Sequence, residues 1–417
     1  MKSSPLFSIL ICTVGKKEMV EGAIQSVLKQ NFADVEIIVT DTSGTDIIRR
    51  LVESLDDNRI HFFEVPNLDP TIGWEFAYTK STGQYVLWYD DDNRLIPNSL
   101  ERYAEIIAKE KADIVSANHV YYFGEGNRHK PAQNNALVFL LPFSSKINVY
   151  DKDTLLSTVY DFSMGTSKMP ARWHSAATFV SRSICEKARA EIGYVIAPHM
   201  YGNFTFHPVI FTYAVKPIYY DRPLCVIGKF SSSITQQWSN VFVNEKRNSA
   251  VPYQFTGVSE RTLGNTTAEC YLRVRHDIQK HEIYPFNWEK FYHRYIDELL
   301  MLNIPFRRHL KAWHEVWITV DKLESNACLI LHRQILRRSL QSVFLDTLRQ
   351  IKLLEIARKL IRKPAENVNR KTISLSPHGI YSIETCAQRL DEILGKELGN
   401  DYFFEKGATN ANTRLKA

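Results

Sequence analysis

Short apolar runs alternate with amphipathic segments along the first 120 residues. Each run has the length of a buried strand and is bounded by turn residues. Between the runs, apolar side chains recur every three or four positions, which is the spacing of one helix face. The runs span residues 8–12, 35–39, 60–65, 85–89 and 113–120, and the amphipathic segments span 19–28, 47–55, 74–81 and 97–109. This alternation predicts an α/β fold with a mostly parallel sheet covered by helices on both faces.

Polar residues follow three of the expected strands: Thr13-Val14-Gly15, then residues 41–46, then Asp90-Asp91-Asp92-Asn93. In a parallel sheet these strand ends share the edge where ligands bind. Three consecutive carboxylates after a buried strand repel one another unless a cation neutralises them. Because the ligands are oxygens with no His or Cys beside them, Mg²⁺ or Mn²⁺ is the expected ion. The competing interpretation is a solvated acidic turn that opens the next helix.

The rest of the chain divides by pattern and composition. Residues 121–230 are irregular and rich in aromatics, and we interpret them as the completion of a first domain, 1–230. Residues 231–265 are rich in Ser, Thr, Asn and Gln, which is typical of a connector. From 266 to 417 the pattern predicts a helical C-terminal region, with breaks at Pro364 and near 374–379.

Composition places the chain among ordinary globular proteins. Its 417 residues are 44% hydrophobic and 24% charged, which excludes collagen-like and disordered classes. No apolar run approaches the 18 residues of a membrane-spanning helix. The N-terminus lacks a signal-peptide pattern, and the six cysteines contain no CxxC pair. These features predict a cytoplasmic protein with reduced thiols.

Positive charge is concentrated in the C-terminal part. Residues 301–417 carry 20 Lys/Arg and 12 Asp/Glu, a balance of +8, whereas the first 300 residues sum to −2. Residues 331–363 combine nine Lys/Arg with an apolar stripe that includes Ile335, Leu336 and Leu340. Such a helix is suited to peripheral contact with an anionic membrane, here the inner face of the plasma membrane. The alternative is a helix face packed in a bundle. No nucleic-acid motif accompanies the charge, so we expect no nucleic-acid partner.

An ordered set of motifs over residues 5–120 resembles family 2 glycosyltransferases of the GT-A fold, which is Rossmann-like. Residues 36–46, EIIVTDTSGTD, resemble that family's EIIVVDDGSTD strand end. Residues 74–77, WEFA, and 82–92, TGQYVLWYDDD, resemble its NWEFAL…ATGEYVLFLDDDD stretch. A weaker match extends to 230, where residues 221–224, DRPL, resemble a common strand of the family. The resemblance does not reach residues 240–417.

The resemblance implies roles for the residues at these strand ends. Asp90, Asp91 and Asp92 match the family's DxD signature, with Asp92 in direct metal contact and Asp90 nearer the donor ribose and sugar. Asn93 stands where a fourth Asp is common, which leaves the metal position intact. The other expected donor-binding residues are Thr13 and Val14 in the nucleotide pocket, Asp41 as acceptor of a hydrogen bond from the base, and Trp74 stacked on a sugar ring.

At the position of the general base, the chain departs from the family's pattern. The family usually places an Asp about 20 residues before the DRPL strand, but the matching pair here is Gly202-Asn203. Asn cannot take up a proton at neutral pH. We assign the base to His199, with His207 as its neighbour, because His has a suitable pKa. Trp173, His174 and Asn203 are expected in the acceptor region. For each of these histidines and aromatics, a purely structural role is the competing interpretation.

The resemblance implies an inverting, metal-dependent glycosyltransferase with Mn²⁺ or Mg²⁺ as cofactor. Its expected donor is a nucleotide-diphospho-sugar, a UDP-sugar in first place, and its acceptor a glycan or lipid-linked oligosaccharide of surface polysaccharide synthesis. Two other classes stay open: a nucleotidyltransferase, and a non-catalytic GT-A scaffold that binds a glycan or a protein partner. Asn203 favours the scaffold, and the acidic triplet argues against it. The sequence leaves the oligomeric state, the sugar and the linkage open.

Overall fold

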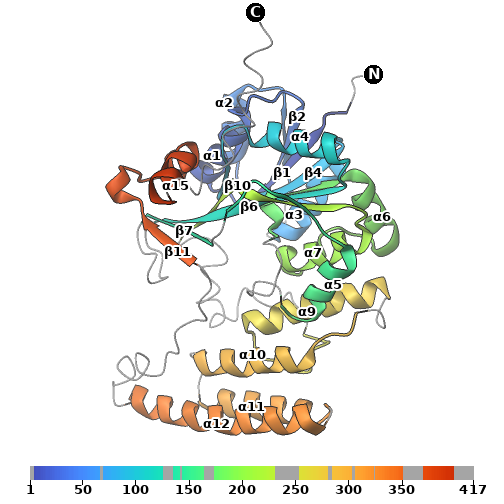
Figure 1. Ribbon diagram of the computed structural model, residues 1–417, viewed down its shortest axis with the longest axis vertical. Coiled ribbons are helices and arrows are strands. Elements are labelled where there is room, and N and C mark those ends of the chain that lie inside the picture. Colours follow the sequence, from blue (N-terminus) through green and yellow to red (C-terminus); the bar gives the residue numbers. More distant parts are fainter. Residues whose placement is uncertain are drawn as a thin grey trace, which may run out of the picture.

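The computed structural model describes most of the chain. The described residues are 4–65, 69–124, 135–140, 143–163, 173–230, 253–279, 284–302, 306–323, 325–350 and 370–398. In this part of the chain, one mixed sheet forms the upper body of the molecule, and a stack of helices extends below it (Figure 1).

The N-terminal part of the sheet is parallel, as expected. Its strands run in the order β4 (Tyr85–Asp90), β1 (Phe7–Thr13), β2 (Val35–Asp41) and β3 (Ile60–Glu64). The crossovers contain α1 (Lys17–Leu28), α2 (Ile47–Leu55) and α3 (Pro70–Lys80), and α4 (Ser99–Glu110) follows the short β5 (Asn93–Leu95). All seven residues of β1 and of β2 are buried, which explains their continuous apolar runs.

The other half of the sheet is mixed rather than mostly parallel. β9 (Thr178–Ser181) lies between β4 and β6 (Ile114–Phe123) and is antiparallel to both. β10 (Pro217–Lys229) is parallel to β6 and antiparallel to β5 and to β8 (Ile147–Val149). The remaining elements of this segment are β7 (Ala136–Leu140), α5 (Lys152–Tyr160), the short η1 (Ser175–Ala177), α6 (Arg182–Ile192) and α7 (Gly202–Tyr213). β9 is antiparallel to both of its neighbours and so interrupts the alternation of parallel strands and helices. This explains the irregular sequence pattern of residues 121–230.

Alternate residues of β1 point into two separate cores, one on each face of the sheet. Leu10 and Cys12 belong to the core under α3, α6 and α7, whereas Ile9 and Ile11 belong to the core under α1, α2 and α4. The first core continues without a break into α9 (Leu263–Ile278), α10 (Trp288–Met301), α11 (Phe306–Val320) and α12 (Ser325–Gln350). Below the sheet follow α9, then α10, and then α11 and α12 side by side in one last layer (Figure 1).

The second half of the expected connector is fixed to α9. Glu269 is fully buried and accepts hydrogen bonds from the backbone N–H groups of Gln254, Phe255 and Thr256. Asn265 donates to the carbonyls of Val258 and Glu260. The residues before α9 are therefore anchored on the helix, while residues 231–252 lie outside the described part of the chain.

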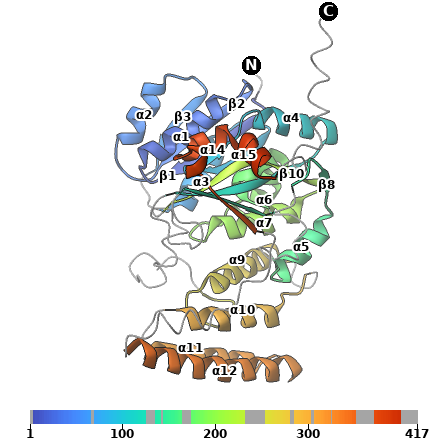
Figure 2. The same cartoon turned by 60° about the vertical axis from the view of Figure 1, so that its left-hand side comes forward.

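After the helices, the chain returns to the sheet. This strand was not expected, because the sequence pattern predicted a helical region over residues 266–417. β11 (Arg370–Ser374) pairs antiparallel with β7 and becomes an edge of the sheet. The turn η3 (Ser376–His378) follows, and then α14 (Ile383–Gln388) and α15 (Leu390–Leu398) cover the α1 side of the sheet (Figure 2). The alternation of exposed and buried residues over 372–375 is the period of a strand, but the segment is too short to stand out among helices.

The structure bears on the expected state of the cysteines and on the question of a membrane-spanning helix. All six cysteines are free thiols, and all except Cys328 are buried. In the part of the chain with assigned structure, no helix combines the length and the apolar character needed to cross a bilayer.

The C-terminal return makes residues 370–398 part of the same folding unit as the sheet. Leu394 on α15 is fully buried in the second core, so Leu394→Ala is expected to lower the free energy of unfolding by about 2–5 kcal/mol. Tyr381→Ala, at a side chain 67% exposed in the same segment, is the control and should change it by less than about 0.5 kcal/mol. Urea denaturation measures both. Equal stability of the two variants would mean that α15 undocks independently of the sheet.

Candidate active site

The structure brings the three predicted strand ends together at one edge of the sheet. Cys12 lies opposite Asp90 in the β1–β4 pairing, and Thr13 lies opposite Asp41 in the β1–β2 pairing. The Thr13 hydroxyl donates a hydrogen bond to Asp91 Oδ2 at 2.8 Å, and its carbonyl accepts one from the Thr42 N–H at 3.0 Å. The geometric expectation is therefore confirmed.

The acidic triplet at the end of β4 is half-buried and flanked by β10. Gly228 approaches it so closely that an added Cβ would lie 2.1 Å from the Asp92 carbonyl oxygen. Burial, followed by the charges of Asp92 and Asp91, raises the pKa of Asp90 to about 7, and the positive charge of Lys229 opposes this rise. Burial and Asp92 likewise raise the pKa of Asp91 to about 6. The carboxylates thus compete for protons near neutral pH, which is the condition that a bound cation relieves.

The donor atoms at this edge fit a hard divalent cation. They are carboxylate oxygens together with Asn93, whose Nδ2 donates to Asp90 Oδ2 at 3.4 Å while its buried Oδ1 has no hydrogen-bond partner in the described structure. The three carboxylates do not bring one oxygen each within 4.8 Å of one another. Such an arrangement suits an ion held by one or two carboxylates and completed by phosphate oxygens and water.

A buried arginine that no sequence pattern indicates supports the backbone under the triplet. Arg94 is 1% exposed, and its Nη1 donates to the carbonyls of Asp91 and Asn93 at 3.0 and 2.7 Å. Its Nε and Nη2 donate to Glu384 Oε1 at 3.0 and 2.8 Å. An added Cβ at Gly22 would lie 2.2 Å from Arg94, so only glycine leaves room for it. Helix α14 is thereby joined to the acidic loop across 290 residues.

Asp41 has a different local role from the one expected. It has no exposed surface, and its two oxygens accept hydrogen bonds from the N–H and the hydroxyl of Ser43 at 2.9 and 2.8 Å. The carboxylate therefore fixes the turn after β2 and cannot contact a nucleotide base unless Ser43 moves. Val14, at the end of β1, is 37% exposed and can contact a ligand directly.

The first turns of α3 pack against the same strand ends. His199, the expected base, is hydrogen-bonded to residues at the N-terminus of this helix. An added Cβ at Gly73 would lie 2.5 Å from Cys12 Sγ and 3.1 Å from the Thr42 methyl group. Asp69 caps α3 through the Thr71 N–H, and its other oxygen lies 2.8 Å from His199 Nδ1. The His199 N–H donates to the Thr71 hydroxyl at 3.0 Å. With its side chain 59% exposed, His199 presents Nε2 away from this pairing.

Trp74 and Trp173 are both packed rather than open to a sugar. Trp74 is 8% exposed, and its ring lies 2.9 Å from the Cβ position of Gly202, so it holds α3 against α7. Trp173 is 6% exposed and contacts the rings of Phe211 and Tyr219 at centroid distances of 5.0 and 5.7 Å. Trp173 therefore has a packing role in the core, where its large apolar ring is buried, and its place in the acceptor region stays a prediction.

The remaining predicted acceptor residues, Asn203 and His174, lie together at η1. Asn203 accepts a hydrogen bond from the Ser175 hydroxyl at 2.6 Å. His174 is half-buried and its ring lies 5.1 Å from that of His119. Burial and the neighbouring His119 and Lys229 hold the pKa of His174 well below its usual value. Lys229 therefore acts on both His174 and Asp90, a position that the sequence did not indicate.

His207 is unsuited to act as a base. It is 5% exposed, and burial lowers its pKa to about 4. It would therefore hold a proton weakly at neutral pH, which leaves His199 as the exposed imidazole of this segment.

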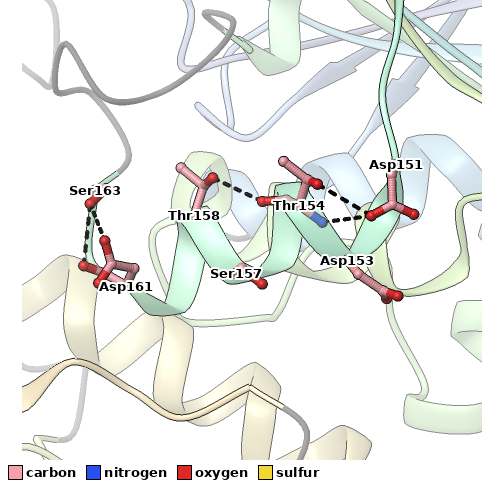
Figure 3. Close-up of a pocket in the computed structure, with 7 residues that line it drawn as sticks. All are labelled: Asp151, Asp153, Thr154, Ser157, Thr158, Asp161 and Ser163. Atoms are coloured by element: carbon pink, nitrogen blue, oxygen red, sulfur yellow. Dashed lines mark hydrogen bonds between the residues drawn. The ribbon is translucent and has the colours of Figure 1, made fainter.

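A polar pocket along α5 is separate from this edge. It is lined by Asp151, Asp153, Thr154, Ser157, Thr158, Asp161 and Ser163 (Figure 3). Its carboxylates already have partners: Asp151 caps α5 at Thr154, Asp153 accepts from Tyr284, and Asp161 pairs with Lys290. The pocket is therefore a solvated polar surface along α5 and not part of the candidate site.

Several known glycosyltransferases are similar in sequence to the N-terminal part of this chain. Residues 8–172 match the model of glycosyl transferase family 2. A GalNAc(5)-diNAcBac-PP-undecaprenol beta-1,3-glucosyltransferase of Campylobacter jejuni is 32% identical over 100 residues, 23% of this chain and 32% of that protein. The Escherichia coli UDP-Glc:alpha-D-GlcNAc-diphosphoundecaprenol beta-1,3-glucosyltransferase WfgD is 26% identical over 115 residues, 27% of this chain and 46% of that protein. The matches thus span less than half of these relatives.

The crystal structure of S. aureus TarS 1-349 in complex with UDP-GlcNAc shares the fold. It is 12% identical, aligns over 88% of this chain and 96% of that one, and has a TM-score of 0.52. The strand order and the acidic strand end agree with the family match, and residues 8–172 are therefore similar to glycosyl transferase family 2 in both sequence and fold.

Proposed function

We propose that this chain is a glycosyltransferase that moves a sugar from a nucleotide-diphospho-sugar to a glycan or lipid-linked acceptor in surface polysaccharide synthesis. The observation that carries the proposal is the meeting of Thr13, the Asp41 turn and Asp90–Asp92 at the carboxyl ends of three parallel strands. The relatives named as glucosyltransferases of undecaprenol-linked substrates support the acceptor class.

A UDP-sugar is the proposed donor, with Mg²⁺ or Mn²⁺ as cofactor. The Escherichia coli relative is named as a UDP-Glc transferase, and the S. aureus TarS structure is a complex with UDP-GlcNAc. Both support this choice. A divalent ion bound there stabilises the charge of the diphosphate leaving group. Asp92 and Asp90 would hold it, Arg94 keeps their loop in place, and Lys229 adds positive charge beside Asp90.

The proposed mechanism is direct displacement with inversion at the anomeric carbon. It needs a base within hydrogen-bond reach of the acceptor hydroxyl, on the face opposite the leaving group. We assign this role to His199, because Asp69 binds its Nδ1 at 2.8 Å and so orients Nε2 toward solvent. A carboxylate at that position also stabilises the imidazolium formed after proton transfer.

The outer face of α11 and α12 is the proposed contact with an anionic membrane. These helices form the end of the molecule farthest from the sheet (Figure 1). Of the expected stripe, Ile335 is buried, while Leu336 and Leu340 are 53% and 71% exposed. Other exposed apolar and basic side chains of the two helices are Leu310, Ile318, Leu329, Ile330, Arg307, Lys311, Arg333 and Arg337. Apolar contact combined with basic charge suits anionic lipids. Residues 351–363 of the predicted basic helix lie outside the described residues.

A non-catalytic scaffold is the second candidate. It is favoured by Asn203, which occupies the usual position of the base and is engaged by Ser175. The two candidates differ in product: a transferase releases free UDP when donor and acceptor are combined, and a scaffold releases none. A nucleotidyltransferase would instead release pyrophosphate.

Removal of the charge at Asp92 tests the metal site. Asp92→Asn is expected to weaken Mn²⁺-dependent binding of UDP by at least about tenfold, because the ion loses an anionic ligand. Isothermal titration calorimetry with Mn²⁺ and then with EDTA measures the effect. Asp56→Asn, an identical change at an exposed left-handed position where Asn is well tolerated, is the control. Unchanged Mn²⁺-dependent affinity in Asp92→Asn would remove Asp92 from the metal site.

The His199 assignment predicts a loss of turnover without a loss of donor affinity. His199→Ala should lower kcat by about 10²-fold or more, in the range found for general bases, while UDP affinity stays within twofold. Release of UDP in the presence of acceptor measures turnover, and calorimetry measures affinity. His61→Ala, at an exposed position of β3, is the control. Full turnover in His199→Ala would contradict the assignment.

Acidic substitutions on α12 test the membrane contact. Leu336→Glu combined with Leu340→Glu should reduce co-sedimentation with anionic vesicles at least fivefold, because the face loses apolar area and gains negative charge. Val215→Glu, at an apolar side chain 82% exposed in a loop near the sheet, is the control and should have no effect. Equal sedimentation of all three proteins would contradict the proposed surface.

A further inference from the structure

The connection between α11 and α12 brings together three metal-binding side chains that the proposed reaction does not use. Asp321 directly follows α11, and Cys328 and His332 lie four residues apart on α12, on one face of that helix. Among the described residues, this is the single group of three or more such side chains whose ligand atoms lie within 4.8 Å of one another. It lies at the end of the molecule opposite the acidic strand end (Figure 1).

We propose that Asp321, Cys328 and His332 form a zinc site, with a water molecule as the fourth ligand. Cys328 Sγ lies 3.4 Å from His332 Nδ1 and 3.8 Å from Asp321 Oδ1. With Zn–S near 2.3 Å and Zn–N near 2.0–2.1 Å, ligand atoms around a tetrahedral ion are about 3.5 Å apart. The Cys328–His332 and Cys328–Asp321 pairs thus have about the spacing of a tetrahedral site before any ion binds, and ligand atoms of all three side chains lie within 4.8 Å of one another.

The imidazole of His332 is held in the orientation that metal ligation needs. Its ring stacks on the Trp317 indole with a centroid distance of 3.9 Å and an interplanar angle of 21°. Its Nε2 lies 3.3 Å from the Trp317 carbonyl and 3.2 Å from Asp321 Oδ1. A proton on Nε2 donates to the Trp317 carbonyl and leaves the lone pair of Nδ1 directed toward Cys328, and the Asp321 carboxylate would turn from Nε2 to the ion when zinc binds. Such a second-shell hydrogen bond is typical of metal-binding histidines.

The ligand set selects the metal. A thiolate beside a carboxylate is repulsive alone and is neutralised by a divalent cation. A soft sulfur ligand with an imidazole favours Zn²⁺, whereas the oxygen-only strand end favours Mg²⁺ or Mn²⁺. The two sites are therefore distinguishable by metal. Bound zinc would cross-link the end of α11 to the first turns of α12 and so fix the connection between the two helices.

Cobalt, a spectroscopic substitute for zinc, provides the test on the full-length protein after EDTA treatment and buffer exchange. We expect one equivalent of Co²⁺ to produce a thiolate-to-metal charge-transfer band, which Zn²⁺ then abolishes by displacement. Cys328→Ser should remove the band, and His332→Ala and Asp321→Asn should each weaken Co²⁺ binding at least tenfold. His314→Ala, at an exposed histidine of α11, is the control.

The other five cysteines are buried, so a band that persists in Cys328→Ser, or the absence of any stoichiometric band in the wild-type protein, would overturn the proposal. A second readout is thermal unfolding, because a metal that binds the native state raises Tm. Zn²⁺ should raise Tm in the wild-type protein and in His314→Ala but not in Cys328→Ser. A similar rise in Cys328→Ser would also contradict the site. Neither result depends on UDP binding or on transferase activity.

Discussion

The parallel pairing of β1 with β2 on one side and with β4 on the other is the constraint on which the candidate site depends. Parallel strands joined by helical crossovers must all end at the same edge. The register then sets Thr13 beside Asp41 and Cys12 beside Asp90. The arrangement brings several acidic groups together in a half-buried place, so the surrounding structure has to stabilise them. Thr13, Asn93 and Arg94 do so by hydrogen bonds, and Lys229 does so by its charge.

The two ends of the molecule differ in the kind of interaction that organises them. At the strand ends, charged groups are gathered by backbone geometry and kept half-buried. At the outer helices, an apolar interior formed by residues such as Leu331 and Ile335 supports a face with exposed leucines and arginines. Both ends are joined by one continuous core that runs from β1 through α9 and α10 to α11 and α12. A continuous core of this kind would keep the proposed membrane-facing end and the proposed sugar-transferring edge at a fixed separation.

Local patterns predicted β1 to β4, β6 and the strand-end location of the site, because each depends on residues close in sequence, but they did not predict the three-residue β5. The role of Asp41 was less predictable, since its carboxylate is used by Ser43 two positions away and burial decides whether a ligand can reach it. Trp173 could not be distinguished from a surface aromatic until its partners Phe211 and Tyr219 were known. The Arg94 pair with Glu384 joins residues 290 positions apart, and no local pattern carries such information. The return of β11 was missed for the same reason.

That return has a consequence for synthesis of the chain. A protein is made from its N-terminus, and domains fold as they emerge. Until residues 370–374 leave the ribosome, β7 lacks its partner on one side and presents an open strand edge. Arg94 likewise lacks its carboxylate partner until Glu384 has been made. The nascent chain thus carries an unprotected sheet edge, and an Arg94 without its Glu384 partner, until residues 370–384 have been made. The candidate site therefore gains its full support only after the helices of residues 263–350 have been synthesised.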